Sequence, residues 1–225
     1  MSRDRPGRLE SIKEVETMRA YATRTGTRRN RAAMFAADWG FFLTPDAHSL
    51  GDWKGRIALD NGAWSAYQKG EGWSSDRFVP LVERYGASSD FVVSPDIVAG
   101  GLASLEMSLD WLPRLLETCP RVLIPVQDGM VPADVEEYLD ERVGIFVGGS
   151  TAWKLASMRA FCRVAARRGA WSHVGRVNSV RRINLCLSSR ATSFDGTSVS
   201  RYAKTLPPLD AARRQSTFFE RFDNV

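Results

Sequence analysis

A short apolar segment that ends in a polar turn and is followed by a helix-like stretch recurs along most of this chain. These segments cover residues 56–60, 91–93, 122–126, 143–147, 173–177 and 191–194. Strands that are apolar almost throughout, each followed by a helix, indicate a parallel sheet covered on both faces. With 32–43 as a further candidate, seven possible strands favour an α/β fold of the compact, TIM-like (β/α) barrel type over an open doubly wound sheet.

The stretches between these segments have the 3.6-residue spacing of apolar side chains that is typical of amphipathic helices. One is expected to begin at a Ser74/Ser75 cap, with Phe78, Leu81, Val82 and Tyr85 on one face. A second carries Leu105, Leu109, Leu112, Leu115 and Leu116, and a third covers 151–168. A short acidic helix is expected after 127–129. No GxGxxG turn opens the first unit, which weakens a dinucleotide-binding interpretation.

The two ends of the chain differ from this regular middle. Residues 1–30 have no apolar stretch and are predicted to form a basic N-terminal arm, with one helix over 10–23. The barrel domain is predicted to cover 31–206. Residues 207–225, which begin at Pro207-Pro208, are predicted to form a C-terminal extension. No linker divides the middle into two domains.

Composition excludes several classes of protein. The 225 residues are 44% hydrophobic and 25% charged, which suffices for one domain with a core of its own. No apolar run approaches the ~20 residues of a membrane span, and the first residues lack the apolar core of a secretory signal. The three cysteines lie far apart, which favours neither a disulfide framework nor a zinc knuckle. We therefore expect a cytoplasmic protein, in the host cytoplasm if a phage encodes it, without membrane contact.

Charge is distributed unevenly. Residues 86–141 hold eleven Asp/Glu and two Arg, whereas residues 142–194 hold ten Lys/Arg and no acidic residue. A segment this basic favours a polyanionic partner, because each neutralised phosphate releases counterions. The alternative is a set of solvated helix faces. The predicted nucleic-acid-binding residues are Lys154, Arg167, Arg168, Arg176, Arg181 and Arg182.

Polar residues stand at the ends of the predicted strands, where barrel enzymes carry their chemistry. They are Asp60, Asp96, Gln127, Gly148-Gly149, His173 and Asp195. Paired carboxylates at a sugar carbon can attack the carbon and move a proton. Three alternatives remain: each Asp caps a helix, the carboxylates bind a metal, or the Gly148-Gly149 turn binds a phosphate. A hydrolase with a Ser or Cys nucleophile is disfavoured because no GxSxG turn is present.

The order of these strand-end motifs resembles the tRNA-guanine transglycosylase family, and above all its short, phage-type relatives that insert 7-deazaguanines into DNA. The resemblance covers about residues 58–201. Its motifs here are Asp60-Asn61-Gly62-Ala63, Asp96, Gln127-Asp128-Gly129, Gly148-Gly149, His173-Val174-Gly175-Arg176 and Ser193-Phe194-Asp195. Asn61 and Ala63 replace the family's Ser and Gly. The family's Cys-rich zinc site is missing, which puts the docking of tRNA in doubt.

The resemblance implies a role for each of these residues. Asp195 would attack C1′ of a guanosine and form a covalent glycosyl intermediate, and Asp60 would move the proton on the bases. The implied substrate-binding residues are Asp96, Gln127, Gly148, Gly149, Asn61 and His173. Trp64 and Trp153 follow two of the motifs and would either sandwich the base or pack in the core. No cofactor or metal is implied.

The implied partners are DNA with an extruded guanine and a free 7-deazaguanine base (preQ0-like). Three other hypotheses stay open: tRNA as the substrate, a catalytically silent nucleic-acid-binding subunit, and an enzyme that acts on a small phosphorylated metabolite. A homodimer or a partner subunit is also open.

Overall fold

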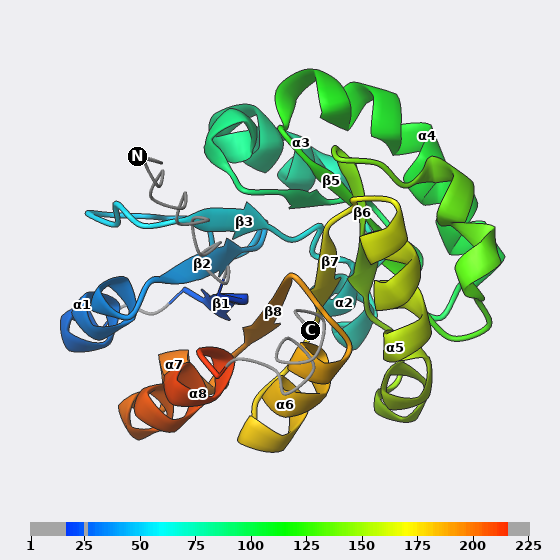
Figure 1. The fold of residues 1–225 in the computed structure, drawn as a ribbon. Coiled ribbons are helices and arrows are strands. Elements are labelled where there is room, and N and C mark those ends of the chain that lie inside the picture. Colours follow the sequence, from blue (N-terminus) through cyan, green and yellow to red (C-terminus); the bar gives the residue numbers. More distant parts are fainter. Residues whose placement is uncertain (1–16, 25–26, 216–225) are drawn as a thin grey trace, which may run out of the picture.

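Eight parallel strands close into a barrel in chain order, with the last strand beside the first (Figure 1). The structure is a computed structural model, and it describes residues 17–24 and 27–215. The strands are β1 (Arg19–Thr23), β2 (Trp39–Leu43), β3 (Ile57–Leu59), β4 (Val92–Val93), β5 (Val122–Val126), β6 (Val143–Val147), β7 (Ser172–Val174) and β8 (Ser193–Gly196). The expected TIM-like α/β barrel is therefore confirmed.

Helices surround this barrel, but two of its connections lack an α-helix. The α-helices are α1 (Arg28–Ala36), α2 (Ala63–Gln68), α3 (Ser75–Tyr85), α4 (Leu102–Thr118), α5 (Thr151–Arg167), α6 (Val180–Ser188), α7 (Ser198–Arg201) and α8 (Leu206–Arg213). No α-helix lies between β2 and β3. Two short 3₁₀ turns, η2 (Pro132–Asp134) and η3 (Glu136–Tyr138), take the place of the acidic helix expected after β5. The barrel is thus a trimmed one.

The first strand lies inside the predicted N-terminal arm. The prediction of an arm over 1–30 with a helix over 10–23 is wrong for residues 19–23, which form β1 between β2 and β8. Ala20, Tyr21 and Ala22 are completely buried there. The sequence of β1, Arg-Ala-Tyr-Ala-Thr, has almost no apolar periodicity. It is recognised as a strand only because it pairs with both neighbours when the barrel closes. Residues 1–16 lie outside the described residues.

The other two predicted boundaries also change. The candidate strand over 32–43 is the end of α1 followed by β2. The predicted extension is wrong for α8, which is part of the barrel wall. Its Arg213 is buried and donates to the Met18 carbonyl at 3.1 Å, while its Asp210 accepts from the Trp39 indole at 2.9 Å. Residues 216–225 lie outside the described residues.

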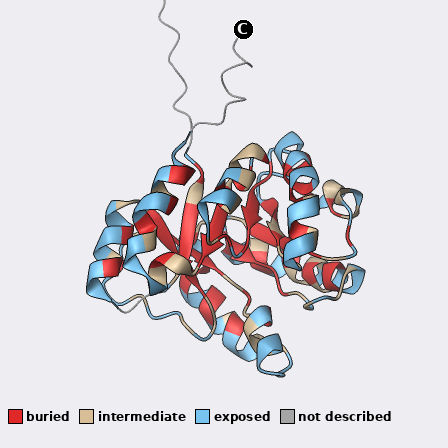
Figure 2. Cartoon of the chain, turned by 90° about the horizontal axis from the view of Figure 1, so that it is seen from below, coloured by how far each residue is buried: buried red, intermediate tan, exposed pale blue. Residues whose placement is uncertain are grey.

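Burial follows the barrel pattern, with buried residues on the strands and exposed ones on the outer sides of the helices (Figure 2). The predicted apolar face of α3 is confirmed, because all four of its residues are buried. Side chains fill the interior of the barrel, as in other TIM barrels, and here most of the large ones are aromatic. They include Tyr21, Phe42, Phe91 and Trp171. Across residues 17–24 and 27–215, no helix has the length and apolarity needed to cross a membrane.

Candidate active site

The C-terminal ends of the strands bring the predicted carboxylates together. Asp60 follows β3 directly, Asp96 follows β4, and Asp195 lies in β8. Because all strands are parallel, these ends meet at one mouth of the barrel. The carboxylates of Asp195 and Asp96 lie close enough to Asp60 to raise its pKa. The acidic centre expected from the sequence is therefore present as a spatial cluster.

Asp60 is the most strongly perturbed carboxyl group of this cluster. Burial raises its pKa to about 7, and the negative charges of Asp195 and Asp96 act in the same direction. The backbone N–H groups of Asn61 and Gly62 oppose this shift by hydrogen bonding to the carboxylate. A carboxyl group with a pKa near neutrality can both donate and accept a proton at physiological pH.

Asn61 serves to hold Asp96. Its Nδ2 donates to Asp96 Oδ1 at 2.7 Å and to the Ser94 carbonyl at 2.6 Å, and its Oδ1 accepts from the Ala63 N–H at 2.8 Å. The side chain of Asn61 is buried and its polar atoms bond within the chain. Its contact with substrate stays a prediction. Burial raises the pKa of Asp96 to about 6, although the bond from Asn61 acts against this.

Gln127 is likewise engaged by its own chain. Its Nε2 donates to the Ile97 carbonyl at 2.8 Å and to Ser104 Oγ at 2.6 Å, and its Oε1 accepts from the Ala99 N–H at 2.7 Å. These bonds fix the loop that joins β4 to α4. The amide therefore supports the loop after Asp96, and a contact of Gln127 with the edge of a base stays a prediction.

The Gly148-Gly149 turn is packed against Asp128. Gly148 N–H donates to the Val126 carbonyl at 2.9 Å, which continues the β5–β6 ladder and takes this group away from a ligand. Gly149 has φ +70°, and a Cβ atom there would lie 2.5 Å from Asp128 Oδ2. Asp128 in turn accepts from the N–H of Ser150 at 2.6 Å. The second glycine is thus required by the fold of the turn itself.

Asp195 has one oxygen held and the other free. Its Oδ1 lies 3.1 Å from His173 Nε2 and accepts from the Arg176 N–H at 3.2 Å. Its Oδ2 has no hydrogen bond from any residue that the structure describes. His173 is 0% exposed, lies beneath Asp195 and contacts that carboxylate. Its contact with substrate stays a prediction. Side chains alternate between the two faces of a strand, so the positions of these residues in β7 and β8 could have predicted that both point into the barrel.

Arg176 crosses the mouth of the barrel. It follows β7, and its guanidinium lies 4.6 Å from the ring centroid of Trp64, which follows β3. In a closed barrel of eight strands in chain order, β3 and β7 are on opposite sides. The guanidinium also donates to the carbonyl of Gly149. The side chain therefore spans the opening above the carboxylates.

The two candidate tryptophans have different roles. Trp64 is 41% exposed and stacks on Tyr67 with ring centroids 5.8 Å apart, so the core-packing interpretation is wrong for it. Trp153 is half-buried against Phe161, with ring centroids 5.5 Å apart, and belongs to the packing of α5. Only Trp64 presents a ring at the mouth.

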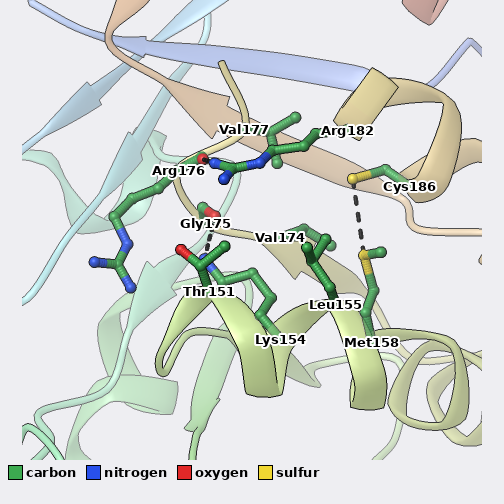
Figure 3. Close-up of a pocket in the computed structure, with 10 residues that line it drawn as sticks. All are labelled: Thr151, Lys154, Leu155, Met158, Val174, Gly175, Arg176, Val177, Arg182 and Cys186. Carbon is green, nitrogen blue, oxygen red and sulfur yellow. Dashed lines mark hydrogen bonds between the residues drawn. The ribbon is translucent and has the colours of Figure 1, made fainter. Parts of the chain in front are cut away.

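Lys154 does not belong to an exposed basic surface. It is 6% exposed, and its Nζ donates to the Gly175 carbonyl at 2.5 Å (Figure 3). Burial lowers its pKa to about 8, and the positive charge of Arg176 adds to this. The adjoining cavity, between α5 and α6, has a volume of about 10 Å³, which is too small for a base. Lys154 therefore holds the Gly175–Arg176 turn beside Asp195, and its contact with nucleic acid stays a prediction.

The remaining predicted basic residues fall at two ends of the molecule. Arg181 and Arg182 begin α6 at the mouth. Arg167 and Arg168 lie at the end of α5, at the end of the barrel away from the mouth. At 1.5 Å per residue, this is about 25 Å from the start of the helix. Arg167 pairs there with Glu136 at 3.0 Å. The predicted nucleic-acid surface is thus divided, and only one pair of arginines lies near the carboxylates.

Within the described part of the chain, no three His, Cys, Asp or Glu side chains are grouped so that they could hold a metal ion. Comparison of the sequence with models of known protein families and with curated proteins gives no match.

Proposed function

We propose that this protein exchanges guanine in DNA for a 7-deazaguanine through a covalent intermediate on Asp195. The observation that carries the proposal is the arrangement of two carboxylates at one mouth. Asp195 has a fixed Oδ1 and a free Oδ2, and Asp60 has a pKa of about 7. A positioned nucleophile beside a group that can move a proton at neutral pH is what base exchange at a sugar carbon requires.

The reaction then has two symmetrical halves. Asp195 Oδ2 attacks C1′ of the target nucleotide, the bond from C1′ to the base breaks, and the protonated Asp60 gives its proton to the departing guanine. In the second half, the Asp60 carboxylate takes a proton from the incoming 7-deazaguanine. The ring nitrogen of the 7-deazaguanine attacks C1′, and the bond from C1′ to Asp195 Oδ2 breaks. Asp60 is protonated again, so the proton count is unchanged over the cycle.

Recognition of the base is assigned to Asp96 and Trp64. Asn61 holds Asp96 Oδ1, and a carboxylate fixed in this way can accept the side-by-side N–H donors of a guanine edge. The Arg176 guanidinium, which is planar like a base, lies over the ring of Trp64. We propose that the base takes this position and that the displaced arginine moves to the phosphates.

The experiment that tests the proposed function compares Asp195→Asn with the natural chain. Labelled DNA mixed with the natural chain should give a covalent adduct that survives denaturation, and the adduct should vanish in Asp195→Asn, because the amide cannot attack C1′. Asp210→Asn is a suitable control, since this carboxylate lies on α8 in the barrel wall. Exchange of labelled guanine by Asp195→Asn at the natural rate would refute the assignment.

A further inference from the structure

A buried chain of hydrogen bonds runs beneath Asp195. The indole Nε1–H of Trp171 donates to Ser193 Oγ at 2.7 Å, Ser193 Oγ lies 2.8 Å from His173 Nδ1, and His173 Nε2 lies 3.1 Å from Asp195 Oδ1. Ser193 and His173 are 0% exposed. The chain therefore connects the interior of the barrel to the held oxygen of Asp195 without access to solvent.

The groups at the two ends of this chain, an indole that can only donate and a carboxylate that can only accept, favour one direction for its hydrogen bonds. An indole N–H can only donate, so Ser193 Oγ accepts from Trp171 and has its own hydrogen left for His173 Nδ1. The Asp195 carboxylate can only accept, which places a proton on Nε2, and among the described residues no other acceptor bonds Ser193 Oγ, so the serine hydrogen is directed at His173 Nδ1. Nδ1 is then the accepting nitrogen of a neutral imidazole. The ring proton stands on Nε2 and points at Asp195 Oδ1. A doubly protonated ring would direct two donors at Ser193 Oγ and leave the serine hydrogen without this acceptor.

The surroundings of His173 also favour the neutral ring. Phe146 stacks on it with ring centroids 5.2 Å apart, and Phe91 lies at 5.0 Å. The charged groups that face it are Asp195 on β8 and Lys154 on α5. Burial lowers the pKa of His173 and Lys154 adds to this, whereas Asp195 opposes the shift. The Tyr21 ring also borders it, but its hydroxyl is turned toward Asp90, to which it donates at 2.5 Å.

We infer that His173 is a positioning residue, locked by Ser193 and Trp171 in the neutral Nε2–H tautomer, that holds one oxygen of Asp195 so that the other is aimed at the sugar carbon. This inference rests on the proposed function of Asp195. A neutral donor orients the carboxylate without placing a full positive charge on it, which would weaken its attack. Ser193 is not itself a nucleophile, because it is buried and its hydrogen is turned to His173.

Nuclear magnetic resonance of the ring nitrogens tests the tautomer without any reaction. The chain has two histidines, and the second, His48, is exposed. A His48→Gln variant therefore assigns the signals. His173 is expected to show a protonated Nε2 and an unprotonated Nδ1 throughout the neutral range. An Nδ1–H tautomer, or a charged ring at neutral pH, would overturn the inference whatever the chain does to DNA.

Two substitutions test the consequence for the reaction. His173→Leu removes the donor and should slow adduct formation on the order of 100-fold, the effect of removing one preorganised donor, with the KM for DNA unchanged. His173→Gln places a neutral amide N–H toward Asp195 and should recover part of this rate. A folded His173→Leu that forms the adduct at the natural rate would refute the positioning role.

If His173→Leu does not fold, Ser193→Ala keeps the question open to test. Without the serine hydrogen, Nδ1 no longer has the donor that kept it unprotonated, so a second tautomer should appear together with a slower adduct. An unchanged tautomer in Ser193→Ala would show that Ser193 does not set it, and would overturn the inference. If the natural chain forms no adduct at all, the proposed function fails, and the tautomer measurement still decides on the buried chain separately.

Discussion

At the scale of single residues, Asp60 is expected to lower the stability of the protein in exchange for its proton chemistry. Its pKa is raised from 3.8 to about 7, so between these values the folded chain binds a proton that the unfolded chain has released. The stability linked to this proton is complete below about pH 4 and is lost as the pH rises through about 7. Asp60→Asn cannot ionise, and it should raise the free energy of unfolding at about pH 8 by about 4 kcal/mol.

Urea unfolding of both chains at about pH 8 and about pH 4 measures this effect. The gain in Asp60→Asn should shrink toward zero at the lower pH, where Asp60 of the natural chain is protonated in both states. Base exchange by the variant should fall sharply at either pH. An equal gain at the two pH values would mean that Asp60 has no raised pKa in the folded chain.

Asp96 is expected to select the base without taking part in the covalent step. Asp96→Asn keeps an oxygen for the bond from Asn61 but lacks the carboxylate that accepts two N–H donors. Binding of free guanine should weaken about 10- to 100-fold, as for the loss of hydrogen bonds to a charged group. The adduct with DNA should still form. Competition between guanine and labelled 7-deazaguanine measures this, and unchanged base affinity would mean that Asp96 has only a structural role in the turn after β4.

The sequence predicts where the three carboxylates lie, but it does not predict the hydrogen bonds of the amides beside them. Asp60, Asp96 and Asp195 stand at strand ends, and a parallel barrel brings strand ends together. Asn61 and Gln127 are at strand ends too, yet their amides hold Asp96 and its loop, because hydrogen-bond partners far along the chain decide their use. Spacing along the sequence contains no information on such partners.

At the scale of elements, runs of apolar residues predict the apolar strands, but they do not reveal β1, whose sequence contains no such run. β5 (Val-Leu-Ile-Pro-Val) and β6 (Val-Gly-Ile-Phe-Val) contain no polar side chain, and their predicted bounds match the structure. β1 reads Arg-Ala-Tyr-Ala-Thr, and its burial comes entirely from its neighbours β2 and β8. Tertiary context outweighs local pattern in such a short strand.

The direction of the helices gives a matched pair of variants for nucleic-acid contact. Each helix of the barrel begins at the mouth and ends at the other face, so Arg181 and Arg182 lie near the carboxylates whereas Arg167 and Arg168 do not. Changing both arginines of the first pair to Gln should weaken DNA binding and make its salt dependence shallower, by roughly one unit for each phosphate that is no longer neutralised. The same change in the second pair, which removes equal charge, should leave the slope unaltered.

Titration of labelled DNA at several salt concentrations measures both slopes. A net-charge effect alone would change them equally, because the two double variants have the same total charge. Equal slopes would therefore show that DNA does not contact the start of α6, and that the basic segment is a set of solvated helix faces.

At the scale of the whole molecule, the two ends of the barrel are built for different purposes. At the end away from the carboxylates, Trp171 lies between the guanidinium groups of Arg19 and Arg121, at 4.9 and 4.5 Å from its ring centroid. Tyr21 and Asp90 add a hydrogen bond there. The interior is packed with aromatic rings, so a substrate can reach Asp195 only through the mouth that Arg176 crosses.

This single mouth favours DNA over tRNA as the substrate. Under the proposed function, contacts at Trp64, Arg176 and the start of α6 would reach one extruded base and its neighbouring phosphates, which any strand with an accessible guanine can supply. We therefore expect exchange into DNA, and faster exchange into a single strand than into a duplex of the same sequence, because extrusion from a duplex costs a few kcal/mol.

Folding of a tRNA should bring no gain in exchange rate over the same RNA after heat denaturation. Exchange assays with labelled base on the four substrates, side by side, measure these rates. Efficient incorporation into folded tRNA, with none into DNA, would contradict the preference and direct attention to the basic residues at 3–31 as the docking element.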